Sequence, residues 1–187
     1  MDRLGTVLLT LVALGQVARA QEPGETVVVV RETSMKREKE VVQTLAPGRF
    51  ARVEDVDSTW LWVSAENAGW IARHDVATPK EAIEIFTARI DEGADDALTY
   101  TALGNAKLAD KQIDEAITDF NEALRRDPKL IVALTSRAHA LAEQRHFEKA
   151  LADLNQAAQL DPQSVDVLFL RGTLLAERGQ FEKAAAD

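Results

Sequence analysis

The sequence predicts a multidomain α and β protein, in which a small β-barrel precedes an α-solenoid, a stack of helix pairs. Ten valines and all three tryptophans lie between residues 27 and 76, whereas residues 82–186 contain 21 alanines, three valines and no tryptophan. β-branched and aromatic residues favour strands, and alanine favours helices. The second half also repeats every 34 residues, as stacked helix pairs do. We place the boundary at Thr78 and Pro79, an N-cap residue and a first-turn proline.

The composition excludes several classes of protein. The chain has 187 residues, of which 46% are hydrophobic and 28% charged, as is typical of folded chains. The formal net charge of -9 gives no electrostatic support for binding nucleic acid or an anionic membrane. There is no cysteine, which excludes disulfides, thiolate metal sites and a cysteine nucleophile.

Residues 1–20 are predicted to be a signal peptide. Residues 4–14 form an apolar stretch, and Ala18 and Ala20 are small residues at the two positions that signal peptidase reads. We expect cleavage after Ala20, a short linker over residues 21–24, and a periplasmic or secreted protein. The alternative is an uncleaved membrane anchor. Because the apolar run is shorter than the roughly 20 residues of a bilayer span, we expect no stable membrane span after cleavage.

Residues 25–77 are predicted to form a five-stranded barrel. Short apolar runs separated by turn residues give the expected strands 26–30, 40–45, 49–56, 59–63 and 70–73. Five short strands cannot cover both faces of an open sheet, so a strongly bent, nearly closed barrel is expected. The segment from Arg31 to Glu40 is expected to be a charged hairpin tip.

Three motifs stand out in this unit: Pro47-Gly48-Arg49-Phe50, Trp60-Leu61-Trp62-Val63 and Gly69-Trp70-Ile71. Together they resemble bacterial Src-homology-3 (SH3) barrels. The resemblance implies a fold that binds peptides or cell-wall peptidoglycan, and so a contact with cell-wall glycan. Trp60, Trp62 and Trp70 are candidates for a ligand platform, and the alternative is that they only pack in the barrel. The segment Arg31–Glu40 has no aromatic residue, which argues against recognition of proline-rich peptides.

The helical half contains columns of similar residues spaced by 34. One small-residue column contains Ala116, Ala150 and Ala184, and a second contains Gly104, Ala138 and Gly172. Large apolar residues follow the first column by four positions, at Phe120 and Leu154. Small residues let two helices approach closely, and large ones fill the space between successive helices. We expect helices over 80–92, 97–110, 113–126, 131–144, 147–160 and 165–178.

This joint pattern closely resembles the tetratricopeptide repeat. The resemblance implies a leading helix at 79–96, repeats at 97–130 and 131–164, and an incomplete repeat at 165–187. Each unit buries its apolar face only by stacking on a neighbour. The third unit stops within its second helix, so we expect either a longer array or an open end that self-association covers, which would make a homo-oligomer.

The resemblance also implies a groove, lined by the first helices of successive repeats, that holds a peptide or protein partner. The expected lining residues are Leu98, Thr101, Asn105, Leu108, Thr135, His139, Phe169 and Thr173. Asn105 matches an asparagine that holds a peptide's terminal carboxylate in some members of the family. Thr101, Ser136 and Leu170 stand where basic companions would help, so we expect no carboxylate clamp and a mildly apolar groove. The alternative is that many of these residues merely pack between helices.

Two charged columns accompany the small ones. Arg137 and Arg171 share one column, and Asp119, Asp153 and Asp187 share another. The first interpretation is an arginine ladder for an acidic ligand. The second, which we favour, is a repeated ion pair inside the array that fixes its geometry.

Nothing in the sequence points to catalysis, and we expect no enzyme activity, cofactor or metal site. The histidines His74, His139 and His146 do not have the spacing of a zinc site. We interpret the chain as an exported interaction module or scaffold, whose barrel adds a second contact or tethers it to the cell wall. Two alternatives stay open: a self-associating assembly protein, and the non-catalytic part of a longer enzyme or sensor.

Overall fold

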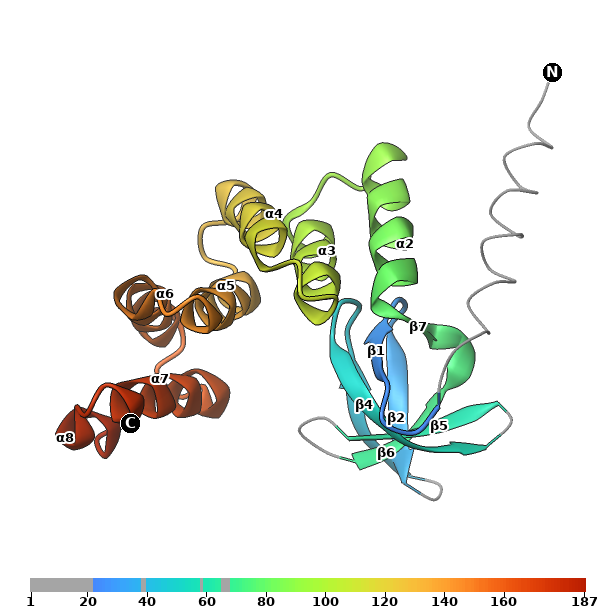
Figure 1. Cartoon of the computed structure of the whole chain (residues 1–187), viewed down its shortest axis with the longest axis horizontal. Coiled ribbons are helices and arrows are strands. Elements are labelled where there is room, and N and C mark those ends of the chain that lie inside the picture. Colours follow the sequence, from blue (N-terminus) through green and yellow to red (C-terminus); the bar gives the residue numbers. More distant parts are fainter. Residues whose placement is uncertain (1–21, 38–39, 58, 65–67) are drawn as a thin grey trace. The chain divides into compact units, whose positions relative to one another are not determined.

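A computed structural model describes residues 22–187, apart from 38–39, 58 and 65–67 (Figure 1). The predicted signal peptide and its cleavage site therefore lie outside the described residues. Contacts divide the chain into two compact units, residues 1–88 and 89–187, which we describe one at a time.

The first unit is built on an antiparallel sheet of seven strands. The strands are β1 (Thr26–Val29), β2 (Thr33–Arg37), β3 (Glu40–Leu45), β4 (Phe50–Asp57), β5 (Trp60–Ser64), β6 (Ala68–Ala72) and β7 (Val76–Ala77). They pair in the order β3-β2-β6-β5-β4-β1-β7, and a 3-10 helix, η1 (Arg73–Asp75), precedes β7. Helix α2 (Pro79–Asp91) follows the sheet.

All five predicted strands are present, but the expected number of strands was too low. The segment Arg31–Glu40 was predicted to be a charged hairpin tip, and this was wrong because residues 33–37 form β2. The strand pairs with β3 and β6 and buries Met35 completely, while Lys36 and Arg37 face outward. A single buried side chain in a charged segment is too weak a periodic signal to identify a strand. The pairing order of the described strands runs from β3 to β7 without closing.

The core of the sheet lies on one of its faces. Strands β5 and β6 alternate between half-buried and buried residues, so Leu61, Val63 and Ile71 join the core. Val27 and Val29 of β1 belong to the same cluster. Because side chains on a strand alternate between faces, the tryptophans of β5 and β6 all lie on the outer face.

The helical elements lie close to their predicted positions. They are α3 (Ala97–Ala109), α4 (Ile113–Arg126), α5 (Ile131–Glu143), α6 (Phe147–Leu160), α7 (Val165–Glu177) and the short α8 (Phe181–Ala184). The predicted N-cap of α2 is confirmed, since the Glu81 amide donates to the Thr78 hydroxyl at 3.4 Å and the Thr78 amide donates to the Glu81 carboxylate at 3.0 Å. This reciprocal pair is a capping box.

The two helices of the first repeat cross at the predicted small-residue column. Gly104 of α3 packs so closely on α4 that a β-carbon there would lie 2.6 Å from the Phe120 ring. In the second repeat Ala138 occupies the same column, and the smaller Leu154 takes the place of Phe120. At each crossing, a smaller residue on the first helix thus accompanies a larger one on the second, and a larger residue on the first accompanies a smaller one on the second.

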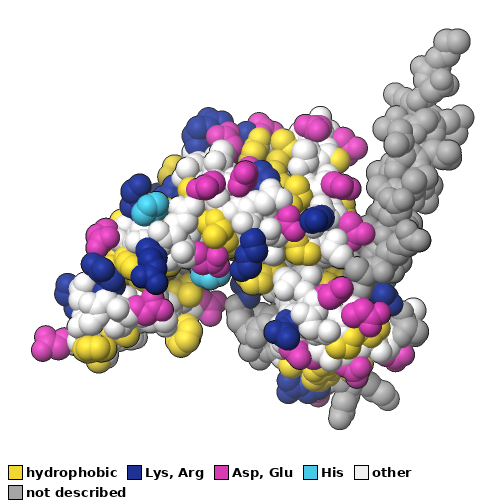
Figure 2. Space-filling view, viewed as in Figure 1, with side chains coloured by type: hydrophobic (Ala, Val, Ile, Leu, Met, Phe, Trp, Pro, Cys, Tyr) yellow, Lys and Arg dark blue, Asp and Glu magenta, His cyan; other side chains and the backbone are white. Residues whose placement is uncertain are grey.

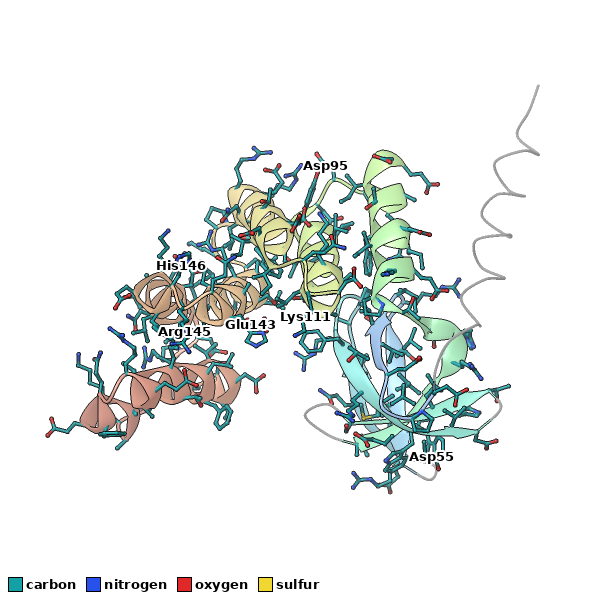
Figure 3. All side chains as sticks on the ribbon, viewed as in Figure 1. Asp55, Asp95, Lys111, Glu143, Arg145 and His146 are labelled. Carbon is teal, nitrogen blue, oxygen red and sulfur yellow. The ribbon has the colours of Figure 1, made fainter. Side chains whose placement is uncertain are left out.

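The turn inside each repeat holds a residue with a left-handed backbone. These residues are Lys111, Arg145 and Gly179, again 34 apart, with φ of 66°, 61° and 73°. Figure 3 labels Lys111 and Arg145 at the turns that follow α3 and α5. Left-handed backbone is the usual conformation at the end of a helix, and it reverses the chain into the second helix of each repeat.

A repeated ion pair links the helices, as the interpretation that we favoured predicted. Arg137 on α5 donates hydrogen bonds of 2.8 and 2.7 Å to Asp153 on α6, and one of 2.8 Å to Asn121 on α4. One repeat later, Arg171 on α7 donates in the same way to Asp187 and to Asn155 of α6. Each arginine thus joins its own repeat to the repeat before it.

The first repeat pairs its aspartate with a different residue, and this ion pair joins only the two helices of that repeat. Leu103 occupies the arginine column there, and the Lys107 ammonium, one turn further along α3, lies 2.6 Å from the Asp119 carboxylate. Burial raises the pKa of Asp119, although its contact with Lys107 acts in the opposite direction. In the third repeat the hydrogen bond from Arg171 holds the pKa of Asp187 below its usual value.

We predict that Gly104→Ala destabilises the helical unit by about 1–2 kcal/mol. Overpacking against Phe120 costs about 1–3 kcal/mol, and the higher helix propensity of alanine offsets up to about 1 kcal/mol. Adding Phe120→Leu should recover part of the loss, because that pair then matches Ala138 and Leu154. Gly172→Ala is the control, since its β-carbon would meet nothing closer than 3.4 Å. Urea unfolding measures the three variants beside the unmodified chain, and equal losses for Gly104→Ala and Gly172→Ala would contradict the packing argument.

We predict that Arg137→Met destabilises the helical unit by about 2–4 kcal/mol, because it leaves the Asp153 carboxylate buried without its partner. The side chains of the pair are only 23% and 8% exposed. Arg125 forms a comparable pair with Glu122, but its side chain is 68% exposed. Arg125→Met should therefore cost less than about 1 kcal/mol in the same urea titration. Similar losses for the two variants would show that the buried pair has no special structural role.

Candidate functional site

The predicted groove residues of the first repeat are mostly buried. Thr101, Asn105 and Leu108 are 3%, 6% and 3% exposed, whereas Leu98 is 62% exposed. The Thr101 hydroxyl donates to the Ala97 carbonyl of its own helix at 2.7 Å. Leu108 packs in a cluster with residues of α4 and α5. For Leu108 the structure therefore favours the alternative interpretation, packing between helices.

Three of the four predicted groove residues on α5 and α7 surround a pocket of about 280 Å³. Thr135 and His139 of α5 and Thr173 of α7 all line it. The apolar lining comes from three helices and consists of Ala138, Ala142, Leu154, Leu170 and Leu174. The structure thus brings three of the eight predicted groove residues together around one apolar cavity.

Apart from His139, the polar groups at the rim of this pocket are acidic or already hydrogen-bonded. The hydroxyls of Thr135 and Thr173 donate to carbonyl groups of their own helices. His139 lies 3.7 Å from the carboxylate of Glu143, and Glu177 lines the pocket directly. Figure 3 labels Glu143 at the end of α5. No lysine or arginine of the described chain lines this pocket.

Sequence reasoning did not identify Glu143 and Glu177, although a signal for them was present. The two glutamates are 34 residues apart and therefore occupy the same column of successive repeats. Each follows the groove residue of its own helix, His139 or Thr173, by one turn. The apolar residues Leu154 and Leu174 were missed because their contact with the pocket depends on how the helices pack.

Phe169, the remaining predicted groove residue, belongs to another surface. It lines a larger pocket of about 600 Å³ with Leu168 and Ala184. Phe169 and Phe181 are 71% and 69% exposed, and Val165 is 77% exposed. Figure 2 shows hydrophobic side chains at the surface of this end of the helical unit. We call the exposed surface of α7 and α8 around Phe169 the end face.

The second repeat buries the residues that correspond to three residues lining this larger pocket, Leu168, Gly172 and Ala184. Leu134, Ala138 and Ala150, which stand 34 residues before Leu168, Gly172 and Ala184, are at most 2% exposed. They are covered because another repeat follows them in the array. The end face therefore has the composition of a surface that packs against a helix.

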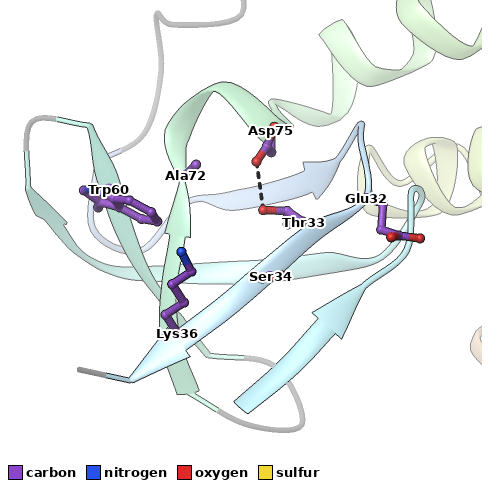
Figure 4. A pocket seen from close by; sticks show the side chains of 7 residues that line it. All are labelled: Glu32, Thr33, Ser34, Lys36, Trp60, Ala72 and Asp75. Carbon is purple, nitrogen blue, oxygen red and sulfur yellow. Dashed lines mark hydrogen bonds between the residues drawn. The ribbon is translucent and has the colours of Figure 1, made fainter. Parts of the chain in front are cut away.

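The outer face of the sheet contains a further pocket, of about 270 Å³, which is lined mainly by polar residues (Figure 4). Trp60 forms one wall, and the Lys36 ammonium lies 5.5 Å from the centre of its ring. The Thr33 hydroxyl donates to the Asp75 carboxylate at 2.8 Å on the other side. The remaining predicted platform residues, Trp62 and Trp70, contact each other edge to face at 5.4 Å. All three tryptophans are half-buried.

The described residues contain neither a candidate metal site nor a candidate membrane-spanning helix. No group of three or more histidine, aspartate or glutamate side chains in them is arranged to hold a metal ion. None of their helices combines the length and the hydrophobicity that crossing a membrane requires. The expectation that the chain is not an enzyme stays a prediction.

Comparison with known proteins addresses the helical unit. Two family models of the tetratricopeptide repeat match it, one over residues 97–130 and the other over residues 135–187. No curated protein sequence matches the chain.

Two solved structures illustrate the similarity of fold. The crystal structure of MamA is 18% identical, with a TM-score of 0.54, and the match covers 58% of this chain and 63% of MamA. The crystal structure of YrrB, a TPR protein with an unusual peptide-binding site, is 22% identical, with a TM-score of 0.51. That match covers 57% of this chain and 55% of YrrB, so the chain spans less than two thirds of either protein. Residues 97–130 and 135–187 of this chain therefore match tetratricopeptide repeats in sequence, and the helical unit resembles them in fold.

Proposed function

We propose that this chain is an exported interaction module whose repeats bind a peptide or protein segment across α5 and α7. The observation that carries the proposal is the pocket of about 280 Å³ between these helices, with an apolar lining and partly polar rim. Binding sites commonly combine a concave apolar surface with a few polar groups that fix orientation. The YrrB structure, with its peptide-binding site and the same fold, supports the same class of ligand.

The sheet unit is the second contact in this proposal. Trp60 presents a half-buried ring beside the polar groups of Lys36 and Asp75, and a flat aromatic surface with adjacent polar groups suits a peptide or a glycan. A contact with cell-wall glycan would tether the repeats at the site of export. The predicted signal peptide over residues 1–20 is the basis for export.

We predict that the chain from Gln21 to Asp187 selects peptides from a displayed library of random dodecapeptides, and that Thr173→Trp abolishes the selection. Thr173 is exposed at the rim of the pocket, so an indole there would block it. Thr118→Trp is the matched control: Thr118 is also an exposed helical threonine whose hydroxyl donates to the carbonyl four residues earlier, but it lies on α4 outside the pocket.

Sequencing of the bound pool measures enrichment for the three proteins. Loss of enrichment with Thr173→Trp alone supports the pocket as the binding site. Equal enrichment for all three proteins, or none for the unmodified chain, would contradict the proposal.

The end face supports a second candidate function, self-association. Val165 and Phe169 expose apolar side chains at a pocket of about 600 Å³, and Phe181 of α8 is exposed as well. Leu168, Gly172 and Ala184 also line this pocket, and the second repeat buries the residues 34 positions before them. A helix from a second copy of the chain would cover the same kind of surface.

We predict, on this second candidate, a dimer that dissociates on dilution and that Phe169→Glu disrupts, because a charge cannot be buried in an apolar interface without a partner. Light scattering over a wide concentration range measures the mass. Leu98→Glu is the control, since Leu98 is 62% exposed but lies on α3. A mass that equals one chain at every concentration rules out self-association through the end face.

A further inference from the structure

The rim of the pocket between α5 and α7 has a one-sided charge. Glu177 lines the pocket, and Glu143 lies one turn beyond His139, a pocket residue whose ring it approaches to 3.7 Å. The two glutamates occupy the same column of successive repeats, so they stand at matching positions on the two helices that flank the pocket. Glu177 lines the pocket itself, whereas Glu143 adjoins it through its contact with His139.

The nearby arginines are held away from this rim by other partners. Arg137 and Arg171 of α5 and α7 donate to Asp153 and Asp187. Arg178, which follows Glu177 directly, donates to Glu148 of α6 at 2.8 Å and stacks over the Phe147 ring. These cations therefore do not neutralise the acidic rim by direct contact in the described structure.

The floor of the pocket is apolar and small. Ala138, Leu154 and Leu174 are 2%, 2% and 5% exposed, and Leu170 completes the apolar surface. A volume of about 280 Å³ is slightly below the range of roughly 300–1,000 Å³ typical of sites for whole small molecules. The size suits one large apolar side chain of a longer segment.

We propose that the partner segment places a leucine, methionine or phenylalanine in this pocket, with a lysine or arginine beside it that binds Glu143 and Glu177. The segment lies within a chain and not at its C-terminus, because the described pocket offers no cation to a terminal carboxylate. This inference rests on the proposed function and adds the chemistry of the partner: a basic, apolar-anchored internal segment.

The test repeats the peptide selection, with each dodecapeptide displayed inside a longer loop. It compares the unmodified chain, the double variant Glu143→Gln/Glu177→Gln, and the control Glu182→Gln. Glu182 is an exposed glutamate on α8 outside the pocket. We expect the unmodified chain and the control to enrich peptides with a large apolar residue next to lysine or arginine. The double variant should keep the apolar preference and lose the basic one.

One enriched peptide is then synthesised with blocked ends, and its affinity is measured by fluorescence anisotropy. Replacing its basic residue by glutamine should weaken binding by about two- to fivefold per lost ion pair, the range for exposed pairs. The double variant should not distinguish the two peptides.

The outcomes separate the two proposals. Enrichment of acidic peptides, or a basic preference that survives in the double variant, would overturn this inference and leave a peptide-binding groove. Enrichment of apolar peptides without a basic residue would overturn only the role of the glutamates. A selection that enriches nothing would contradict the inference and the proposed function together.

Discussion

The helical unit depends on one repeated interaction, in which an arginine pairs with an aspartate of its own repeat and donates a hydrogen bond to an asparagine of the repeat before. Arg137 contacts α4 and α6 from α5, and so fixes the position of three helices at once. Because Asp153 is buried, forming the pair removes both charged groups from water, and this desolvation offsets much of their attraction. Removing one partner therefore costs more stability than the intact pair contributes. The pocket between α5 and α7 can keep its shape only while these helices keep their spacing.

The same interaction determines the electrostatics of the groove. Arg137 and Arg171 could in principle serve an acidic ligand, but their guanidinium groups are directed to aspartates of the array. In the part of the chain that the structure describes, no second helix provides such a partner for Glu143 or Glu177, and both glutamates stand near the pocket. Because these arginines bind aspartates of the array, the carboxylates of Glu143 and Glu177 are the charged groups that a ligand at the pocket would meet.

The helices could be predicted from the sequence because a solenoid repeats short-range interactions. Each residue of a column meets the same neighbours as the residue 34 positions away, so the spacing of Gly104, Ala138 and Gly172 carries structural information. Strand β2 could not be predicted in this way. Its burial of Met35 depends on pairing with β6, whose sequence lies more than 30 residues away.

The pocket was only partly predictable for a similar reason. Thr135, His139 and Thr173 follow from the repeat pattern, because they lie on the groove side of the first helices. Leu154 reaches the pocket from the second helix of its repeat, and only the packed structure shows that contact. The burial of Thr101 and Asn105 also shows that equivalent positions in successive repeats do not have equal access to a ligand.

The charge of the whole chain acts in the same direction as the rim of the pocket. With 31 acidic and 22 basic residues, the protein attracts basic segments over distances of about a Debye length, and salt weakens this attraction. Long-range attraction raises the rate of encounter but does not distinguish one basic segment from another. The apolar pocket does distinguish them, because a charged or short side chain cannot replace a leucine or phenylalanine against Leu154 and Leu174. The two features together would select a segment by its charge first and by its anchor residue afterwards.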